Sequence, residues 1–302
     1  ENKKKNNSAF NMENMIDDRL PEFFPAEDGS NFWTVQSDLK RQWDDPVRRV
    51  NLKRKIVIVS ILTGGIVFNT HASFMAPGGD GPDCLYDWAF RVTRHMNSWF
   101  SEHTSVRDLM IASSSFCMDI SFLGFATYFV TKSRTLRPLV SLLLVYIVRA
   151  LFQLIYQMRM PDGRQWEYPG FPSLVVPYFE SHDFFYSGHV GAATMMAMQF
   201  RIEKYYKISY IIGLVAVYET FVLITLRCHY SIDIISAVLF VFYYVLHVPK
   251  FVPFLDKIFF VQPGELEQEK QKEDFEETAI EDPQEGEDDN EKSRLLEGHS
   301  RQ

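Results

Sequence analysis

Long apolar runs fill the middle of the chain, and polar, charged segments flank them on both sides. A helix of about 20 apolar residues crosses the hydrocarbon core of a bilayer, and six runs come close to that length. These runs lie at residues 55–75, 108–130, 138–158, 184–200, 208–226 and 230–250. Because backbone groups in hydrocarbon must pair within their own segment, each run is expected to be a helix.

The pattern predicts an all-α fold, a polytopic membrane protein built as a bundle of six transmembrane helices. A large soluble helical domain would need polar faces on these helices, and residues 208–226 offer almost none. Residues 1–54 are expected to form a polar amino-terminal segment, and residues 55–250 the membrane domain. The remainder, residues 251–302, is an acidic tail with few apolar residues, so it is predicted to be mostly disordered.

Lysines are unevenly divided between the two sides of the predicted spans. All the flanking ones fall on one side: Lys53, Lys55, Lys132, Lys204, Lys207, Lys250 and Lys257. The positive-inside rule makes that side cytosolic, so both tails are expected in the cytosol. The other loops then face the lumen or the exterior, in the endoplasmic reticulum, the Golgi or the plasma membrane. Within the tail, Glu291, Leu295 and Leu296 have the spacing of an acidic dileucine signal, which would bind a sorting adaptor.

Two histidines and an aspartate lie where spans meet this non-cytosolic side. His229 and Asp233 are four residues apart at the start of a helix, so the carboxylate can accept a hydrogen bond from one ring nitrogen. The other nitrogen stays basic, and an imidazole held in this way can act as a nucleophile or a base. His189 opens the fourth span on the same side, where it is placed to act as a general acid or base.

The residues before His189 favour phosphate binding. Ser187 is an expected N-cap, Gly188 permits close approach of the backbone, and the unpaired amides of a helix start attract anions. A structural reading also exists, in which Ser187 only caps a helix and Tyr186 and Tyr230 belong to an aromatic belt. The combination of these groups at one depth favours phosphoryl chemistry over that reading, with Ser187, Gly188, Tyr186 and Tyr230 as candidate substrate-binding residues.

Two motifs carry a resemblance to a known family. FYSGHV at 185–190 and LRCHYSID at 226–233 resemble motifs of the sphingomyelin synthase and phosphatidylcholine:diacylglycerol cholinephosphotransferase family, and are closest to the cholinephosphotransferases. This family belongs to the lipid phosphatase/phosphotransferase superfamily. Further similar segments are GPDCLYD at 81–87, KSRTLRP at 132–138, MPDG at 160–163, and the pair Tyr146 and Arg149. The resemblance covers residues 55–250.

The resemblance implies a transferase that uses a lumenal or exoplasmic triad of His189, His229 and Asp233. His229 would attack the phosphorus of a phospholipid, most favourably phosphatidylcholine, and form a phosphohistidine. His189 would protonate the departing diacylglycerol and then accept a proton from the incoming lipid alcohol. Diacylglycerol is the favoured acceptor, while ceramide as acceptor and ethanolamine as headgroup stay open. Asp183 would contact the substrate or order the loop before Ser187.

Membrane lipids are the partners that this chemistry implies, and no cofactor, metal or nucleic acid is expected. Whether the protein forms a homo-oligomer stays open. A catalytically silent scaffold is disfavoured, because it would have no need of all three triad groups. A lipid phosphate phosphatase is disfavoured as well. Such enzymes carry Lys-x6-Arg-Pro and an arginine six residues before the second histidine. In this chain Lys132 stands at another spacing from Arg137, and Leu223 occupies the position of that arginine.

Three ionisable residues are predicted inside the spans: Asp119, Arg149 and Glu219. An unpaired charge in hydrocarbon is expensive, so each is expected to have a partner or to face a polar cavity. Arg149 would bind either a carboxylate or the lipid phosphate. The ion pair is slightly favoured, because its predicted depth is below the triad, and either acid is a candidate partner.

Overall fold

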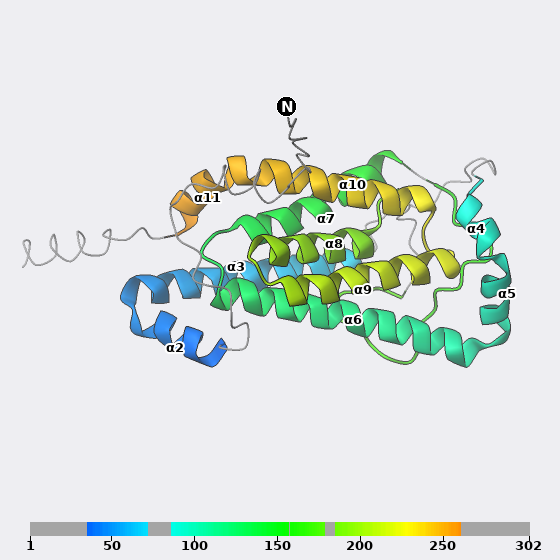
Figure 1. Ribbon diagram of the computed structural model, residues 1–302, viewed down its shortest axis with the longest axis horizontal. Helices are drawn as coiled ribbons and strands as arrows, with labels where there is room; N and C mark the ends of the chain where they lie inside the picture. The colour runs from blue at the N-terminus through cyan, green and yellow to red at the C-terminus, as the bar shows by residue number, and fades with distance from the viewer. Residues whose placement is uncertain (1–34, 72–85, 157, 179–184, 261–302) are drawn as a thin grey trace, which may run out of the picture. The chain divides into compact units, whose positions relative to one another are not determined.

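The computed structural model of the chain describes residues 35–71, 86–156, 158–178 and 185–260. Every regular element within these ranges is a helix, which confirms the all-α prediction. The helices belong to one structural unit that ends at Phe259. In chain order they are α2 (Val35–Asp44), α3 (Pro46–His71), α4 (Trp88–Val92), α5 (Arg94–Glu102), α6 (Thr104–Thr131), α7 (Arg137–Ile155), α8 (Gly188–Ile202), α9 (Tyr206–Thr225), α10 (Ser231–His247), the 3-10 turn η1 (Val248–Lys250) and α11 (Val252–Phe259) (Figure 1).

Four of the described helical segments are long and apolar enough to cross a membrane: α6, α7, α9, and α10 extended by η1. They correspond to the predicted second, third, fifth and sixth spans and indicate an integral membrane protein. The helices at the predicted first and fourth spans, α3 and α8, fall outside this set. With 15 residues, α8 is short because Ser187 caps it and its first residue is Gly188. The count of six spans and the cytosolic termini therefore stay predictions.

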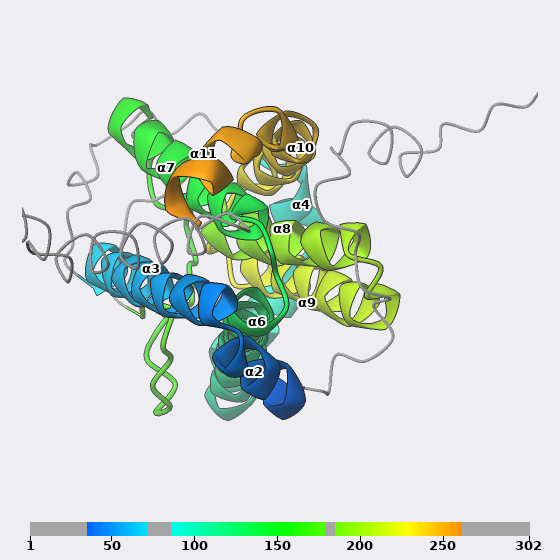
Figure 2. The ribbon, with the colours of Figure 1, turned by 90° about the vertical axis from the view of Figure 1, so that its left-hand side faces the viewer.

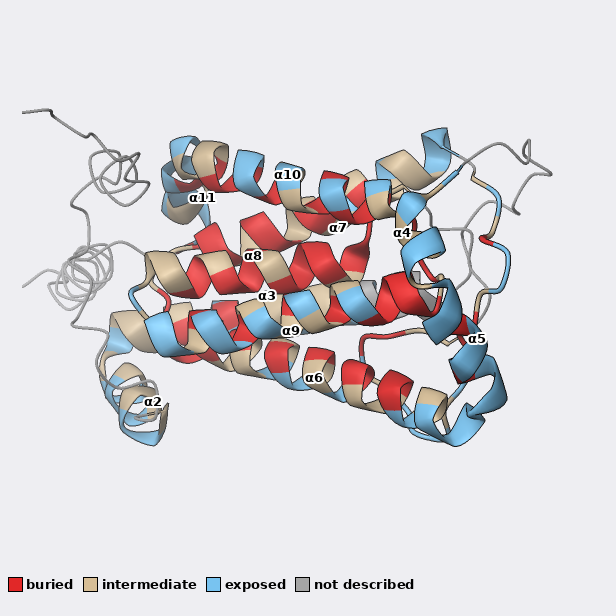
Figure 3. Ribbon diagram, turned by 45° about the vertical axis from the view of Figure 1, so that its right-hand side comes forward, coloured by how far each residue is buried: buried red, intermediate tan, exposed pale blue. Residues whose placement is uncertain are grey.

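The short helix α8 lies at the centre of the bundle. It packs against α6, α7, α9 and α10, and the end-on view of Figure 2 shows it between α9 and α10. Most of its surface is buried (Figure 3). Small side chains at Gly191, Ala192 and Ala193 allow the neighbouring helices to approach closely. One face, with Met196, joins a core shared with α6 and α9, and another, with Met195, joins a core shared with α7 and α10.

The outer faces of the bundle are apolar. Large exposed side chains on α6, α9 and α10 include Leu109, Leu123, Leu214, Val217 and Leu239. An apolar surface of this extent is unfavourable in water. In a bilayer the same side chains would contact hydrocarbon, which agrees with the membrane assignment.

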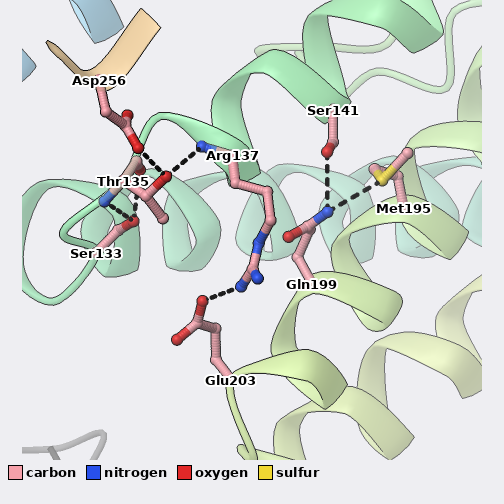
Figure 4. A network of polar contacts seen from close by, with 8 residues as sticks. All are labelled: Ser133, Thr135, Arg137, Ser141, Met195, Gln199, Glu203 and Asp256. Carbon is pink, nitrogen blue, oxygen red and sulfur yellow. Dashed lines mark hydrogen bonds and ion pairs between the residues drawn. The ribbon is translucent and has the colours of Figure 1, made fainter. Parts of the chain in front are cut away.

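Polar contacts gather where α2, α11 and the loop between α6 and α7 lie (Figure 1). Asp256 of α11 accepts hydrogen bonds from the backbone N–H of Leu136, at 2.7 Å, and from the hydroxyl of Thr135, at 2.6 Å. Arg137 forms an ion pair with Glu203, between α8 and α9 (Figure 4). Lys132 pairs in turn with Asp38 of α2. The lysine-bearing loops thus meet at one end of the bundle, and KSRTLRP serves to join helices there.

The short helices α4 and α5 lie at the other end (Figure 1). Asp87 caps α4 by accepting from the N–H of Ala89, and it also accepts from the N–H and the hydroxyl of Ser231 at the start of α10. Asn97 of α5 donates to the carbonyl oxygen of Thr225 at 2.9 Å. Both contacts fix the turn between α9 and α10, which carries His229.

The first prediction concerns Asp256. Asp256→Ala removes the acceptor for the N–H of Leu136 at the start of α7, which is expected to lower the free energy of unfolding by about 1 to 2 kcal/mol. Thermal unfolding of the purified protein in detergent micelles measures the change. The matched control is Asp44→Ala, because Asp44 is exposed at the end of α2. Equal midpoints for the two variants would contradict the assigned role.

Candidate active site

A buried hydrogen bond joins His229 and Asp233. Nδ1 of His229 lies 3.1 Å from Oδ2 of Asp233, and the two residues are 3% and 0% exposed. The same oxygen accepts from the backbone N–H of Tyr230 at 2.9 Å, so Asp233 also caps the first turn of α10. The carboxylate therefore fixes the orientation of the imidazole ring. With Nδ1–H donating to Asp233, the lone pair of Nε2 is available for chemistry.

Asp233 also connects this pair to the start of α8. Its carbonyl oxygen accepts from the N–H of Ser187 at 3.2 Å. Ser236, one turn further along α10, donates to the carbonyl oxygen of Phe185 at 2.8 Å. Phe185 has a φ of +104°, a conformation that a residue with a side chain rarely adopts, so the chain bends sharply before α8. Ser187 then caps the helix by accepting from the N–H of Val190. The two motifs, far apart in sequence, are thus held together through backbone groups.

His189 lies near the second histidine. It is within electrostatic range of both His229 and Arg149. Its ring stands edge-on to Trp166, with ring centroids 6.0 Å apart. Its Nδ1 is buried and has no hydrogen-bond partner among the described residues. The structure thus holds His229 against Asp233 and brings His189 within electrostatic range of His229, while the catalytic roles of the three residues stay predictions.

Arg149 lies against the first residue of α8. A Cβ added at Gly188 would be 3.1 to 3.2 Å from three atoms of the Arg149 side chain, so a larger residue there would force the guanidinium to shift. Arg149, Gly188 and His189 line one small cavity together with Met118, Phe122, Tyr146, Val175 and Pro177. A guanidinium beside the amides of a helix start suits phosphate oxygens. The side chain of Arg149 thus reaches the start of α8 and the cavity of His189, while its depth in the membrane stays a prediction.

The two acids predicted inside the spans, Asp119 and Glu219, accept hydrogen bonds from residues far away in the chain. Glu219 accepts from the hydroxyl of Ser114 at 2.7 Å. Asp119 accepts from Ser173, Leu174 and Val175, in the loop between α7 and α8. Neither pairing was predicted, because each partner is more than fifty residues away in the chain.

The tyrosines of the two motifs are packed inside the protein. Tyr186 is 1% exposed and lies among Phe152 and Phe240, so the aromatic-belt reading of this residue was wrong. Tyr230 donates its hydroxyl to the carbonyl oxygen of Arg159 at 3.0 Å. Burial raises the pKa of the Tyr230 phenol, which keeps it a donor. Asp183 lies outside the described residues.

The turn before His229 is held by a segment that sequence reasoning did not single out as part of the site. Gln165 binds the turn through its N–H, which donates to the carbonyl oxygen of Leu226 at 2.9 Å. Arg227 donates to the carbonyl oxygen of Asp162. Gly163 permits this contact, because a Cβ there would lie 2.9 Å from the Arg227 guanidinium, and its φ is +77°. Burial raises the pKa of the Cys228 thiol next to His229, so it stays protonated and is a poor competing nucleophile.

A family model described as AtPDCT1/2 matches residues 86–247, which is more than half of the chain. The match includes both motifs and the described residues that line the cavity. No curated protein and no solved structure matches the chain. The resemblance to sphingomyelin synthases stays a prediction.

The second prediction tests the double role of Asp233. Asp233→Ala leaves the buried N–H of Tyr230 without its acceptor and frees the ring of His229. The free energy of unfolding is expected to fall by about 2 kcal/mol. Unfolding in detergent micelles measures this loss. Asp44→Ala, at an exposed position at the end of α2, is the control and is expected to change stability by less than about 0.5 kcal/mol. A loss at Asp233 as small as that of the control would show that the contact does not hold the turn.

Proposed function

This chain belongs to the AtPDCT1/2 family, a family of phosphatidylcholine:diacylglycerol cholinephosphotransferases, and from this premise we propose that it transfers phosphocholine from phosphatidylcholine to diacylglycerol. The observation that carries the proposal is the buried His229–Asp233 pair with His189 beside it. A nucleophile oriented by a carboxylate, next to a second proton carrier, suits a transfer in two steps.

In the first step, Nε2 of His229 forms a bond to phosphorus while the bond from phosphorus to the glycerol oxygen breaks. His189 gives its proton to that oxygen, and diacylglycerol leaves. Asp233 stabilises the positive charge that develops on the ring of His229. The product on the enzyme is a phosphocholine–histidine intermediate.

In the second step, the hydroxyl oxygen of the acceptor attacks the same phosphorus. Its proton passes to His189, the bond from phosphorus to Nε2 breaks, and His229 is restored. Over a full cycle, therefore, no net proton passes between the two histidines and the solvent. No metal or cofactor is needed to balance either step.

Arg149 and the first amides of α8 are proposed to bind the phosphate oxygens. The contact between Arg149 and Gly188 supports this, since it places a positive charge beside the helix start and in the cavity of His189. Charge that develops on the oxygens in the transition state would strengthen both interactions.

The surroundings favour a phosphodiester over a phosphate monoester. Phosphatases of the superfamily grip a dianion with further basic residues, and their positions are occupied differently here. Leu223 is buried in an apolar core, and Arg137 is paired with Glu203 at the end of α8 away from His189. Fewer cationic contacts suit the single negative charge of a diester.

The proposed orientation places this site in the non-cytosolic half of the membrane. The loops between α6 and α7 and between α8 and α9 lie at the opposite end of the bundle from α4 and α5 (Figure 1). The positive-inside rule then supports a cytosolic position for the lysine-bearing end.

The third prediction is a competition assay. Purified protein in liposomes receives phosphatidylcholine labelled in its headgroup, with diacylglycerol and ceramide in equal amounts. The expected product is phosphatidylcholine that carries the label in its headgroup and the acyl chains of the added diacylglycerol. His229→Ala and His189→Ala are each expected to reduce the rate of transfer by about a thousandfold or more. The first variant loses the group that carries the phosphoryl group, and the second loses the group that carries the proton.

The control for this assay is His247→Ala, at the far end of the same helix α10, which is expected to keep the wild-type rate. Sphingomyelin as the main product would instead assign ceramide as the acceptor. Release of inorganic phosphate from phosphatidic acid without any movement of headgroups would replace the proposal by a phosphatase.

The fourth prediction uses two glycines. Gly188→Ala places a methyl group against the Arg149 guanidinium, so transfer is expected to fall about tenfold or more as the phosphate contact is displaced. Gly213→Ala in α9 is the matched control, because nothing lies within 4 Å of its added Cβ. The rates kcat and kcat/KM are measured for both variants. Equal rates would mean that the position of Arg149 does not matter for transfer.

A further inference from the structure

Asp119 in the middle of α6 holds a segment of the loop between α7 and α8 against this helix. Its Oδ1 accepts from the hydroxyl of Ser173 at 2.8 Å and from the N–H of Val175 at 3.1 Å. Its Oδ2 accepts from the N–H of Leu174 at 2.9 Å. The Ser173 hydroxyl also accepts from the N–H of Val176 at 3.0 Å. A carboxylate inside a span requires such donors, and irregular backbone inside a bundle requires such acceptors.

These bonds place the segment 173–177 at the cavity of His189. Val175 and Pro177 line that cavity, and so does Met118, the residue before Asp119. The carbonyl oxygen of Pro177 accepts from the indole N–H of Trp166 at 3.0 Å, and the ring of Trp166 stands edge-on to His189. Val175 and Val176 are buried, whereas Leu174 is half exposed on the outer side. The segment therefore forms an apolar wall beside His189.

We propose that Asp119 is a positioning residue that holds the wall 173–177 against His189, so that water is kept from the phosphocholine–histidine intermediate. This inference rests on the proposed function. The wall would determine whether the triad transfers the headgroup to a lipid or hydrolyses the intermediate.

The competing reaction needs only water. A water oxygen would attack the phosphorus, the bond from phosphorus to Nε2 of His229 would break, and His189 would take the proton of the water. Free phosphocholine would leave, and no lipid product would form. Because His189 serves a lipid alcohol and water equally well, the choice between them falls to whatever limits access to the site.

Asp119 holds the first half of the wall, while Trp166 holds its end at Pro177. Without the Asp119 carboxylate, two backbone N–H groups and one hydroxyl of the segment lose their acceptor. They would then be satisfied only by water, which draws the segment away from α6 and opens the cavity.

The product ratio tests the proposal. In liposomes with headgroup-labelled phosphatidylcholine and diacylglycerol, the phosphocholine released into water is divided by the headgroup transferred to lipid. Asp119→Ala is expected to raise this ratio about tenfold, and Ser173→Ala to raise it less, because two hydrogen bonds are lost in place of three and the N–H groups of Leu174 and Val175 keep their acceptor. Glu219→Gln is the matched control, since this buried intramembrane acid binds Ser114 on α6 and is expected to leave the ratio unchanged.

The ratio is insensitive to the yield of folded protein, because both products come from the same molecules. If Asp119→Ala lowered release and transfer in proportion, Asp119 would serve the fold alone and the proposal would be overturned. If the wild-type protein formed neither product, the proposed function would be wrong, and so would the proposed role of Asp119 in limiting hydrolysis.

A second measurement does not require turnover. Diethyl pyrocarbonate modifies accessible imidazoles, and mass spectrometry reports the rate at each histidine. Asp119→Ala is expected to speed modification of His189 several-fold while His247 keeps its wild-type rate. An unchanged rate at His189 would show that the segment is no barrier, whatever reaction the triad performs.

Discussion

Asp233 is the residue on which the site depends, because it binds both halves of it. Its carboxylate holds the ring of His229 and the N–H of Tyr230, and its carbonyl oxygen holds the N–H of Ser187 at the start of α8. All these groups are buried, so none can be satisfied by water. The contact of the start of α8 with α10 therefore rests on bonds to the main chain of both motifs.

Polar side chains recur as anchors for segments that are not helical. Asp119 binds the loop at 173–175, Asn97 binds the turn after α9, and Asp256 binds the loop before α7. Outside a helix, a backbone group in a packed region needs a partner from elsewhere in the protein. Each anchor therefore allows the chain to leave helical geometry at a place where function requires a turn or a wall.

The centre of the bundle shows why a short helix is used at the site. Because α8 begins at Gly188, its first amides and His189 lie within the protein rather than at its edge. The loop that precedes α8 then packs against α6, and Arg149 reaches the helix start from α7. A helix of full membrane length would have carried these amides to the surface, where water competes for them.

The sequence alone determined the local features. Apolar runs predicted the helices α6, α7, α9 and α10 to within a few residues, since hydrophobic length and helical pairing are properties of one segment. The spacing of His229 and Asp233 likewise predicted their contact, because one helical turn brings them together. Only the tertiary structure decided which distant groups meet. The hydrogen bonds of Asp119, the contact of Arg149 with Gly188 and the burial of Tyr186 all join residues from different helices and loops. The periodicity of apolar residues along the chain does not predict how those elements pack.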